Sequence, residues 1–277
     1  MTPERLPVPG AIQTGSMKRF NGSPPTHIKS PLEIQYFSQP ELKEPIMIAA
    51  WPGMGYLAKI SADYLRRRLK AKRFAEIRYM QNAIVYKDSL AELPPLRHRF
   101  YASTEEDILF CVGDAQPSTP EEAMRLGEKV VDLAVKYNVR LIYTMAAYPN
   151  DYVDKPRVYG IYTDEKLREE LEKHDVGFIE GEGAVNGLNG ILIGLAKNRG
   201  IDGVCLMGEI RYANVPQHLS SKAVLERLTS LLGLEVDMTP LEKRAKKIDA
   251  SIRKSLGEDP DLDDPIKKEE KSFRYIS

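Results

Sequence analysis

Two carboxylates, Asp114 and Glu209, are the side chains of this sequence that could take part in acid–base chemistry. Each follows a run of apolar residues typical of a buried strand, so each stands at the carboxyl end of its strand. Ligands of open parallel sheets bind at that end, where two carboxylates could exchange protons with a substrate. Either residue could instead cap loop amides or pair with lysine and arginine, and we favour this structural role.

A glycine-containing turn is the second candidate for chemistry. The segment Gly53-Met54-Gly55-Tyr56-Leu57-Ala58 joins an apolar strand to a helix, which is the context that a dinucleotide-binding fingerprint requires. Glu76 follows about twenty residues later, where an acid that binds the ribose would stand. The match is weak, because Trp51-Pro52 constrains the turn and alanine replaces the third glycine. The candidate pocket that follows from these residues consists of Trp51, Gly53, Gly55, Asp114 and Glu209.

Other signatures of catalysis do not occur in the sequence. It contains neither a Gly-x-x-x-x-Gly-Lys-Ser/Thr loop nor a Gly-x-Ser-x-Gly elbow. Cys111 and Cys205 lie in apolar runs, which suits small core residues of a reduced protein. The histidines are His27, His98, His174 and His218. No two of them have the spacing of metal ligands. The sequence therefore predicts no metal, no cofactor and no catalytic residues, and hence a protein that is not an enzyme.

The charge and hydropathy of the chain exclude several classes of protein. Its 277 residues include 40 basic and 40 acidic side chains, so the net charge indicates neither nucleic acid nor an anionic membrane as a partner. No apolar run reaches the roughly 18–20 residues of a membrane span. Prolines interrupt the N-terminal region, where a signal peptide would need an apolar core. We expect a cytoplasmic protein. The cations at 66–73 are interpreted as a solvated helix face, with nucleic-acid binding as the alternative.

Apolar runs alternate with amphipathic stretches along the chain. Buried strands are predicted at 45–50, 107–112, 139–145 and 203–207. Helices with one apolar face are predicted from Leu57, at 119–137, at 185–198 and from Leu219. This alternation indicates an α/β fold, with a mainly parallel sheet and helices on both faces. Residues 92–99, which include Pro94-Pro95, are predicted to form a loop.

Four glycines recur every three or four residues, at 183, 187, 190 and 194. On a helix this spacing places the glycines on one face, and three of them lie inside the predicted helix at 185–198. Each glycine inside a helix costs roughly 0.8–1 kcal/mol relative to alanine, so something must require the missing Cβ atoms. We expect this face to lie close against the sheet. The alternative is a backbone surface that is open to a ligand or to a partner subunit.

The chain is expected to consist of three parts. Residues 1–30 are rich in Pro, Gly, Ser and Thr, and predict a disordered arm. Residues 31–257 predict a single α/β domain that includes a C-terminal helix at 239–256. Residues 258–277 are rich in Asp, Glu and Lys, and predict a flexible tail. Aromatic residues gain nothing from solvent, so the end of this tail is interpreted as a docking peptide with Phe273, Tyr275, Ile276 and Ser277, and chance occurrence is the alternative.

Three motifs identify a resemblance when they are taken in order. The first is Trp51-Pro52-Gly53-Met54-Gly55 before a helix, and the second is the strand and Gln-Pro of Ile108-Leu109-Phe110-Cys111-Val112-Gly113-Asp114-Ala115-Gln116-Pro117. The third is Gly187-x-x-Gly190-Ile191-Leu192-x-Gly194-Leu195-Ala196, followed by Gly203-Val204-Cys205-Leu206-Met207-Gly208-Glu209-Ile210. Together these motifs resemble the proteasome assembly chaperone family, in its archaeal branch related to the second subunit of the eukaryotic chaperone pair. The resemblance covers roughly residues 32–254.

This resemblance implies a three-layer α/β sandwich similar to nucleoside phosphorylases, with no demonstrated active site. It also implies a homo-oligomer that acts with proteasome α subunits or with a second assembly chaperone. Relatives dock through a C-terminal tripeptide of a hydrophobic residue, tyrosine and any residue, which enters pockets between ring subunits. This chain departs from the pattern, because Tyr275 is third from the end and follows Arg274.

Two functions of different classes follow from these observations. The leading hypothesis is a non-catalytic, homo-oligomeric assembly chaperone or scaffold that acts on proteasome subunits and docks through its C-terminal tail. The alternative is an enzyme that binds a small molecule or a nucleotide, with the turn at 53–55 beside Asp114 and Glu209.

Overall fold

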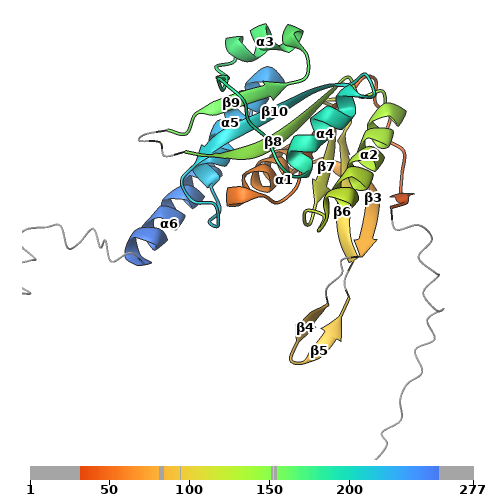
Figure 1. Cartoon of the computed structure of the whole chain (residues 1–277), viewed down its shortest axis with the longest axis horizontal. Coiled ribbons are helices and arrows are strands. Elements are labelled where there is room, and N and C mark those ends of the chain that lie inside the picture. Colours follow the sequence, from red (N-terminus) through yellow and green to blue (C-terminus); the bar gives the residue numbers. More distant parts are fainter. Residues whose placement is uncertain (1–31, 81–83, 94, 151, 153–154, 256–277) are drawn as a thin grey trace, which may run out of the picture. The chain divides into compact units, whose positions relative to one another are not determined.

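An eight-stranded mixed sheet forms the centre of the fold (Figure 1). The structure is a computed structural model that describes residues 32–80, 84–93, 95–150, 152 and 155–255. The predicted arm at 1–30 and the predicted tail at 258–277 lie outside the described residues, as do Phe273, Tyr275, Ile276 and Ser277. The division of the chain into these parts stays a prediction.

The strands lie in the order β1-β3-β6-β7-β2-β8-β10-β9. The four strands β7, β2, β8 and β10 are parallel to one another, and the ladders on either side of them are antiparallel. The bounds are β1 Ile34–Tyr36, β2 Ile46–Ala50, β3 Lys72–Met80, β6 Pro95–Ser103, β7 Ile108–Gly113, β8 Leu141–Pro149, β9 Val158–Tyr162 and β10 Asp202–Ile210. Parallel strands with helices on both faces are buried throughout, which is why β2, β7 and β10 are recognisable as continuous apolar runs.

Helices cover both faces of the sheet and complete three layers. Helices α2 (Pro120–Lys136) and α4 (Leu188–Lys197) pack on one face, in a cluster that includes Met47 and Ala49 of β2. Helices α1 (Leu57–Arg68), α5 (His218–Leu231) and α6 (Thr239–Ser255) pack on the other, with Ile48 and Ala50. Successive side chains of a strand point to opposite faces, so one strand serves both cores. The predicted α/β sandwich is confirmed.

The remaining helical elements are short. They are α3 (Arg168–Lys173) and two 3-10 turns, η1 (Met54–Tyr56) and η2 (Glu165–Leu167). Within the described ranges, no helix has both the length and the apolar character needed to cross a bilayer.

Helix α2 begins at a capping box, as its sequence predicts. The Oγ1 atom of Thr119 accepts the N–H of Glu122 at 3.2 Å, and Oε2 of Glu122 accepts the N–H of Thr119 at 3.3 Å. Pro120 occupies the first turn, where its missing N–H removes no helical hydrogen bond. The box satisfies amides that the first turn leaves without partners and so fixes where the helix starts.

The segment predicted to be a loop at 92–99 is mostly strand, and this prediction is wrong. Strand β6 pairs with β3 on one side and with β7 on the other. Pro95 is its first residue, a position where proline is tolerated. Pro94-Pro95 and the arginines that follow obscured an alternation in which His98, Phe100 and Ala102 are buried.

The predicted glycine face of the helix before β10 is also wrong. Helix α4 starts at Leu188, so the glycines at 183 and 187 lie in the preceding loop. A Cβ atom on Gly194 would meet nothing within 4 Å, and one on Gly190 would meet the Val185 carbonyl oxygen at 1.9 Å rather than the sheet. The close approach of helix α4 to the sheet depends on Gly203 of β10, where a Cβ atom would lie 2.6 Å from the Cβ atom of Ile193.

Strands β4 (Val85–Lys87) and β5 (Leu90–Glu92) form a separate two-stranded sheet. Large apolar side chains are exposed on and beside this hairpin, namely Ile84, Val85, Tyr86, Leu90 and Leu93.

Candidate functional site

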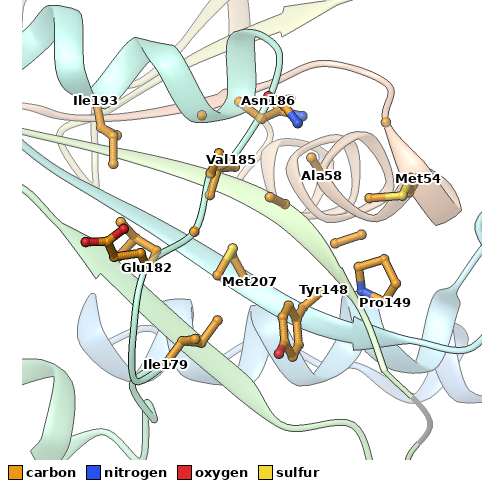
Figure 2. A pocket seen from close by; sticks show the side chains of 18 of the residues that line it. Met54, Ala58, Tyr148, Pro149, Ile179, Glu182, Val185, Asn186, Ile193 and Met207 are labelled. Carbon is orange, nitrogen blue, oxygen red and sulfur yellow. The ribbon is translucent and has the colours of Figure 1, made fainter.

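A cavity of about 790 Å³ lies at the carboxyl ends of the parallel strands β2, β8 and β10 (Figure 2). Gly53 and Met54 follow β2, residues 146–149 end β8, and Met207 belongs to β10. Strand β7 lies on one side of β2 and β8 lies on the other. The cavity therefore lies beside the point where the strand order reverses, which is where open α/β sheets bind their ligands.

Helix α4 and the segment before it complete the wall of the cavity. The helix contributes Asn189, Gly190 and Ile193. The segment at 179–186 passes across the strands, with Glu182, Val185 and Asn186 beside the cavity (Figure 2). The residues of this segment are mostly exposed to solvent, so the cavity is open on this side.

The wall of the cavity is mainly apolar. Its apolar residues are Met54, Ala58, Ala146, Ala147, Tyr148, Pro149, Ile161, Ile179, Ala184, Val185, Ile193 and Met207. Two of its amide side chains are already engaged by the protein. Asn189 accepts the Trp51 N–H at 2.9 Å and donates to the Trp51 carbonyl at 3.0 Å, while Gln116 accepts the N–H of Leu188 at 3.0 Å. These bonds tie α4 to the ends of β2 and β7.

The charge of the cavity is negative. Glu180 and Glu182 stand exposed at its mouth, and none of the described residues that line it is a lysine, an arginine or a histidine. Phosphates and carboxylates are bound in proteins through cationic side chains or clusters of backbone N–H groups. The lining supplies no described cation to an anion, and the charges of Glu180 and Glu182 favour an occupant that is neutral or that carries positive charge.

Trp51, predicted to lie at the pocket, is fully buried behind the wall and is absent from the described lining residues. Its Nε1–H donates to Nδ1 of His98 at 3.0 Å, which fixes that nitrogen as an acceptor. Burial lowers the pKa of His98 from 6.5 to about 4, so the imidazole is neutral at pH 7. The Trp51–His98 hydrogen bond ties the end of β2 to β6. The residues next to Trp51 in the sequence did not indicate this structural role.

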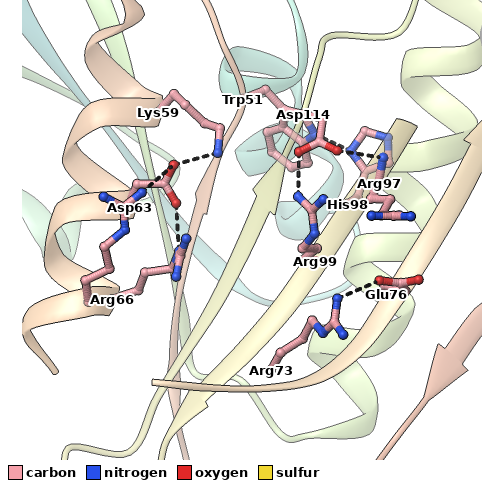
Figure 3. Close-up of polar contacts among 11 residues, drawn as sticks. Trp51, Lys59, Asp63, Arg66, Arg73, Glu76, Arg97, His98, Arg99 and Asp114 are labelled. Carbon is pink, nitrogen blue, oxygen red and sulfur yellow. Dashed lines mark hydrogen bonds and ion pairs between the residues drawn. The ribbon is translucent and has the colours of Figure 1, made fainter. Parts of the chain in front are cut away.

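Asp114 is held by the strand next to β7 (Figure 3). Its Oδ1 atom accepts from Nη1 of Arg99 at 2.5 Å, and its Oδ2 atom accepts the N–H of Arg97 at 3.2 Å. Both bonds cross from β7 to β6, on the side of the sheet away from the cavity strands.

Glu209 makes a second structural network on the opposite side of the sheet centre. Its carboxylate is 3% exposed and accepts from Nδ2 of Asn150 at 2.7 Å, the N–H of Arg157 at 2.8 Å and the hydroxyl of Tyr159 at 3.1 Å. Burial and the bond to Glu209 raise the pKa of Tyr159. Strands β2 and β8 lie between β7 and β10, which separates the two acids by about 14 Å. The structure does not bring the two predicted acids together.

The turn at 53–55 lacks the open amides of a phosphate loop. The N–H of Gly55 donates to the Ala213 carbonyl at 2.6 Å, and the N–H of Tyr56 donates to the Gly53 carbonyl at 2.9 Å. Gly55 has a φ of 61°, and a Cβ atom there would lie 2.6 Å from Cγ of Gln217, so glycine serves the turn itself. Glu76 pairs with Arg73 and Arg78 on β3, three strands away from β2. These contacts count against the nucleotide hypothesis.

The described residues contain no group of three or more His, Cys, Asp or Glu placed to hold a metal ion. Both cysteines are fully buried, and burial raises the pKa of Cys205 to about 11 and that of Cys111 further still. A thiol must lose its proton to act as a nucleophile or a metal ligand. The two cysteines therefore behave as small core residues.

Of the five residues predicted to form the pocket, only Gly53 is among the described residues that line the cavity. Residues 146–149 and 179–186 also line the cavity and were not predicted to do so. The second of these segments includes Glu180 and Glu182, whose exposed charges follow the apolar residues Phe178 and Ile179 and could have indicated the mouth of a cleft.

Comparisons with known proteins agree with the resemblance identified from the motifs. The model of the PAC2 family matches residues 47–256. PbaB of Pyrococcus furiosus, described as an archaeal proteasome activator, is 31% identical in sequence, with a TM-score of 0.71 over 82% of this chain and 99% of PbaB. PbaA of the same organism, described as an archaeal homolog of proteasome-assembly chaperone, is 25% identical, with a TM-score of 0.66 over 81% of this chain and 96% of PbaA.

A relative without an assigned function extends this set. An uncharacterized protein of Methanocaldococcus jannaschii is 29% identical over 222 residues, which are 77% of this chain and 83% of the relative. The family match covers most of the chain, and the similarity to PbaB covers the same three-layer fold. The predicted relationship to the proteasome assembly chaperones is confirmed, and the chain belongs to the PAC2 family.

Proposed function

We propose that this chain is a homo-oligomeric assembly chaperone or scaffold that acts on proteasome subunits in the cytoplasm and catalyses no reaction. The observation that carries the proposal is the similarity to PbaB, an archaeal proteasome activator, which extends over 82% of this chain. The similarity to PbaA, a homolog of proteasome-assembly chaperone, supports the same class of function.

The chemistry of the fold supports a role in binding rather than in catalysis. The oxygens of Asp114 and Glu209 accept hydrogen bonds from within the fold, and neither carboxylate is among the described residues that line the cavity. His98 and both cysteines are buried. The direct partner in this proposal is either a proteasome α subunit or a second assembly chaperone.

We further propose that the C-terminal tail takes part in docking. It carries Phe273, Tyr275 and Ile276 within five residues of its end, although Tyr275 does not occupy the position found in relatives. Apolar side chains on a polar tail bind partners by entering a preformed pocket, where their burial offsets the cost of ordering the tail.

Co-purification of the tagged full-length chain with proteasome α subunits tests the proposal. We expect α subunits, or a second chaperone bound to them, to be retained, and native mass spectrometry to give the number of copies of each chain. The triple variant Phe273→Ser, Tyr275→Ser, Ile276→Ser should retain less, while Ser272→Ala, in the same segment, should behave as the wild type. A full-length chain that retains neither partner would overturn the proposal.

A further inference from the structure

The cavity beside β8 and β10 offers an apolar surface that the described part of the chain leaves open. Met54, Tyr148, Val185 and Met207 surround it, and the ring of Tyr148 is fixed by an edge-on contact with Tyr159 at 5.4 Å. A volume of about 790 Å³ exceeds what one side chain fills and falls within the usual range of ligand pockets. An occupant would therefore present more than one apolar side chain.

The mouth of the cavity selects for positive charge. Glu180 and Glu182 have no opposite charge within salt-bridge distance among the described residues, and the lining contributes no cation. An acidic rim around an apolar floor favours a segment in which cations alternate with aromatic or aliphatic residues.

The end of the tail has that composition. Residues 271–277 read Lys-Ser-Phe-Arg-Tyr-Ile-Ser, with two cations, three largely apolar side chains and no acidic side chain. The acidic residues of the tail, at 258–264 and 269–270, precede this segment and so would remain outside the negative mouth.

The tail is long enough to reach the cavity. Phe273 is 18 positions after Ser255, the last residue of α6, and these 18 steps span up to about 60 Å when extended. A domain of this size has a radius of gyration of about 18 Å, so the extended tail is about three times as long as this radius. Attachment through such a linker gives an effective concentration near the millimolar range, and even a weak contact is then populated.

We infer that residues 271–277 bind within the cavity of their own chain, with Phe273, Tyr275 and Ile276 against its apolar wall and the cations beside Glu180 and Glu182. The cavity is thus a binding site for a peptide that carries aromatic residues and positive charges. A tail held there is withdrawn from any other partner, so the cavity and an external docking site compete for the same residues. The inference does not depend on which external partner the chain has.

Engineered thiols in the full-length chain test this contact. The native Cys111 and Cys205 are fully buried, so added cysteines are the accessible ones. The pair Val185→Cys, Tyr275→Cys reports on the cavity, and Lys243→Cys, Tyr275→Cys is the matched control. Lys243 is exposed on α6, closer to the tail along the sequence but on the other face of the sheet. Disulfide formation is measured in a glutathione redox buffer.

We expect the effective concentration of the 185–275 pair to exceed that of the 243–275 pair by roughly tenfold or more, within single chains. A free peptide of residues 271–277 should lower the yield of the first pair, and the same peptide with serine at 273, 275 and 276 should not. The double substitution Glu180→Lys, Glu182→Lys should lower the effective concentration of the 185–275 pair roughly threefold at low salt.

Three results would overturn the inference. The first is equal disulfide formation in both pairs, which is what an unattached tail gives. The second is a product that forms only between two chains. The third is a stronger disulfide from Phe20→Cys to Val185→Cys, since Lys18-Arg19-Phe20 in the N-terminal region also places cations beside an aromatic residue.

Discussion

Trp51 and His98 illustrate how buried polar residues act in this protein. The indole N–H donates to the unprotonated Nδ1 atom of His98, and burial holds the pKa of His98 at about 4 instead of 6.5. An unfolded chain takes up a proton on this histidine below about pH 6.5, whereas the folded chain does so only near pH 4. The folded state is therefore destabilised as the pH falls through this window, by about 3 kcal/mol from this group.

Replacement of His98 by glutamine tests this linkage. Glutamine keeps an acceptor for the Trp51 N–H but does not titrate, so the free energy of unfolding should lose about 2–3 kcal/mol less between pH 7 and pH 4.5 than in the wild type. Urea unfolding at the two pH values measures the difference. Equal losses in the wild type and in His98→Gln would contradict the assignment of the low pKa.

Glu209 is the second residue whose role is open to a direct test. Its carboxylate accepts three hydrogen bonds that join β10 to the ends of β8 and β9. Glu209→Gln removes the charge and places an NH₂ group against donors, which should cost about 1–3 kcal/mol of stability. Glu182→Gln, exposed at the cavity mouth, should change stability by less than about 0.5 kcal/mol. Thermal unfolding measures the loss of stability in each variant. Equal losses for the two variants would mean that the hydrogen bonds of Glu209 do not stabilise the fold.

At the level of elements, the packing of α4 on β10 depends on the glycine in the strand rather than on those in the helix. A Cβ atom at Gly203 would meet the Cβ and Cα atoms of Ile193 at 2.6 and 3.1 Å, while one at Gly194 would meet nothing. Gly203→Ala should therefore destabilise the fold by about 1–3 kcal/mol, because the backbones must separate.

Gly194→Ala is the matched change on the helix. It should stabilise the fold by about 0.5–1 kcal/mol, because alanine has the higher helix propensity and the site is open. Chemical denaturation of both variants measures the signs. Destabilisation by both substitutions would restore the idea of a glycine face against the sheet.

The elements could be predicted to different degrees for physical reasons. Strands β2, β7 and β10 were evident because a strand buried on both faces is a continuous apolar run. Helix α2 was evident because Thr119, Pro120 and Glu122 mark its first turn within four residues. Strand β6 was missed because prolines and arginines are atypical of a central strand, and the partner of Arg99, Asp114, comes beside it only when β6 pairs with β7.

At the level of the whole molecule, the hairpin of β4 and β5 is the part that most needs a partner. A two-stranded hairpin is marginally stable by itself, and this one exposes Tyr86 by 78% and Leu90 by 69%. We predict that the hairpin contacts a second copy of the chain in a homo-oligomer, since the burial of apolar groups in such a contact lowers the free energy.

Native mass spectrometry of Tyr86→Ser, Leu90→Ser tests this prediction. The variant should form smaller assemblies than the wild type at equal concentration. Met124→Ser, Val135→Ser is the control, because it removes apolar side chains that are 42% and 40% exposed on α2. A change of mass in the control pair and not in the hairpin pair would assign the interface to α2 instead.

The class of the fold, most of its strands and helices, and the family were predictable from the sequence, because apolar periodicity, helix caps and ordered motifs are local patterns. The position of the cavity was not, because it depends on contacts between distant segments. Gly53, Tyr148, Val185 and Met207 are far apart in the chain, and the strand order β2-β8-β10 brings them around one cavity. The same strand order separates Asp114 from Glu209 and gives each acid partners within its own side of the sheet. The position of each acid at the end of a strand could be predicted from the sequence. The distance between the two acids could not, because it depends on which strands lie between them.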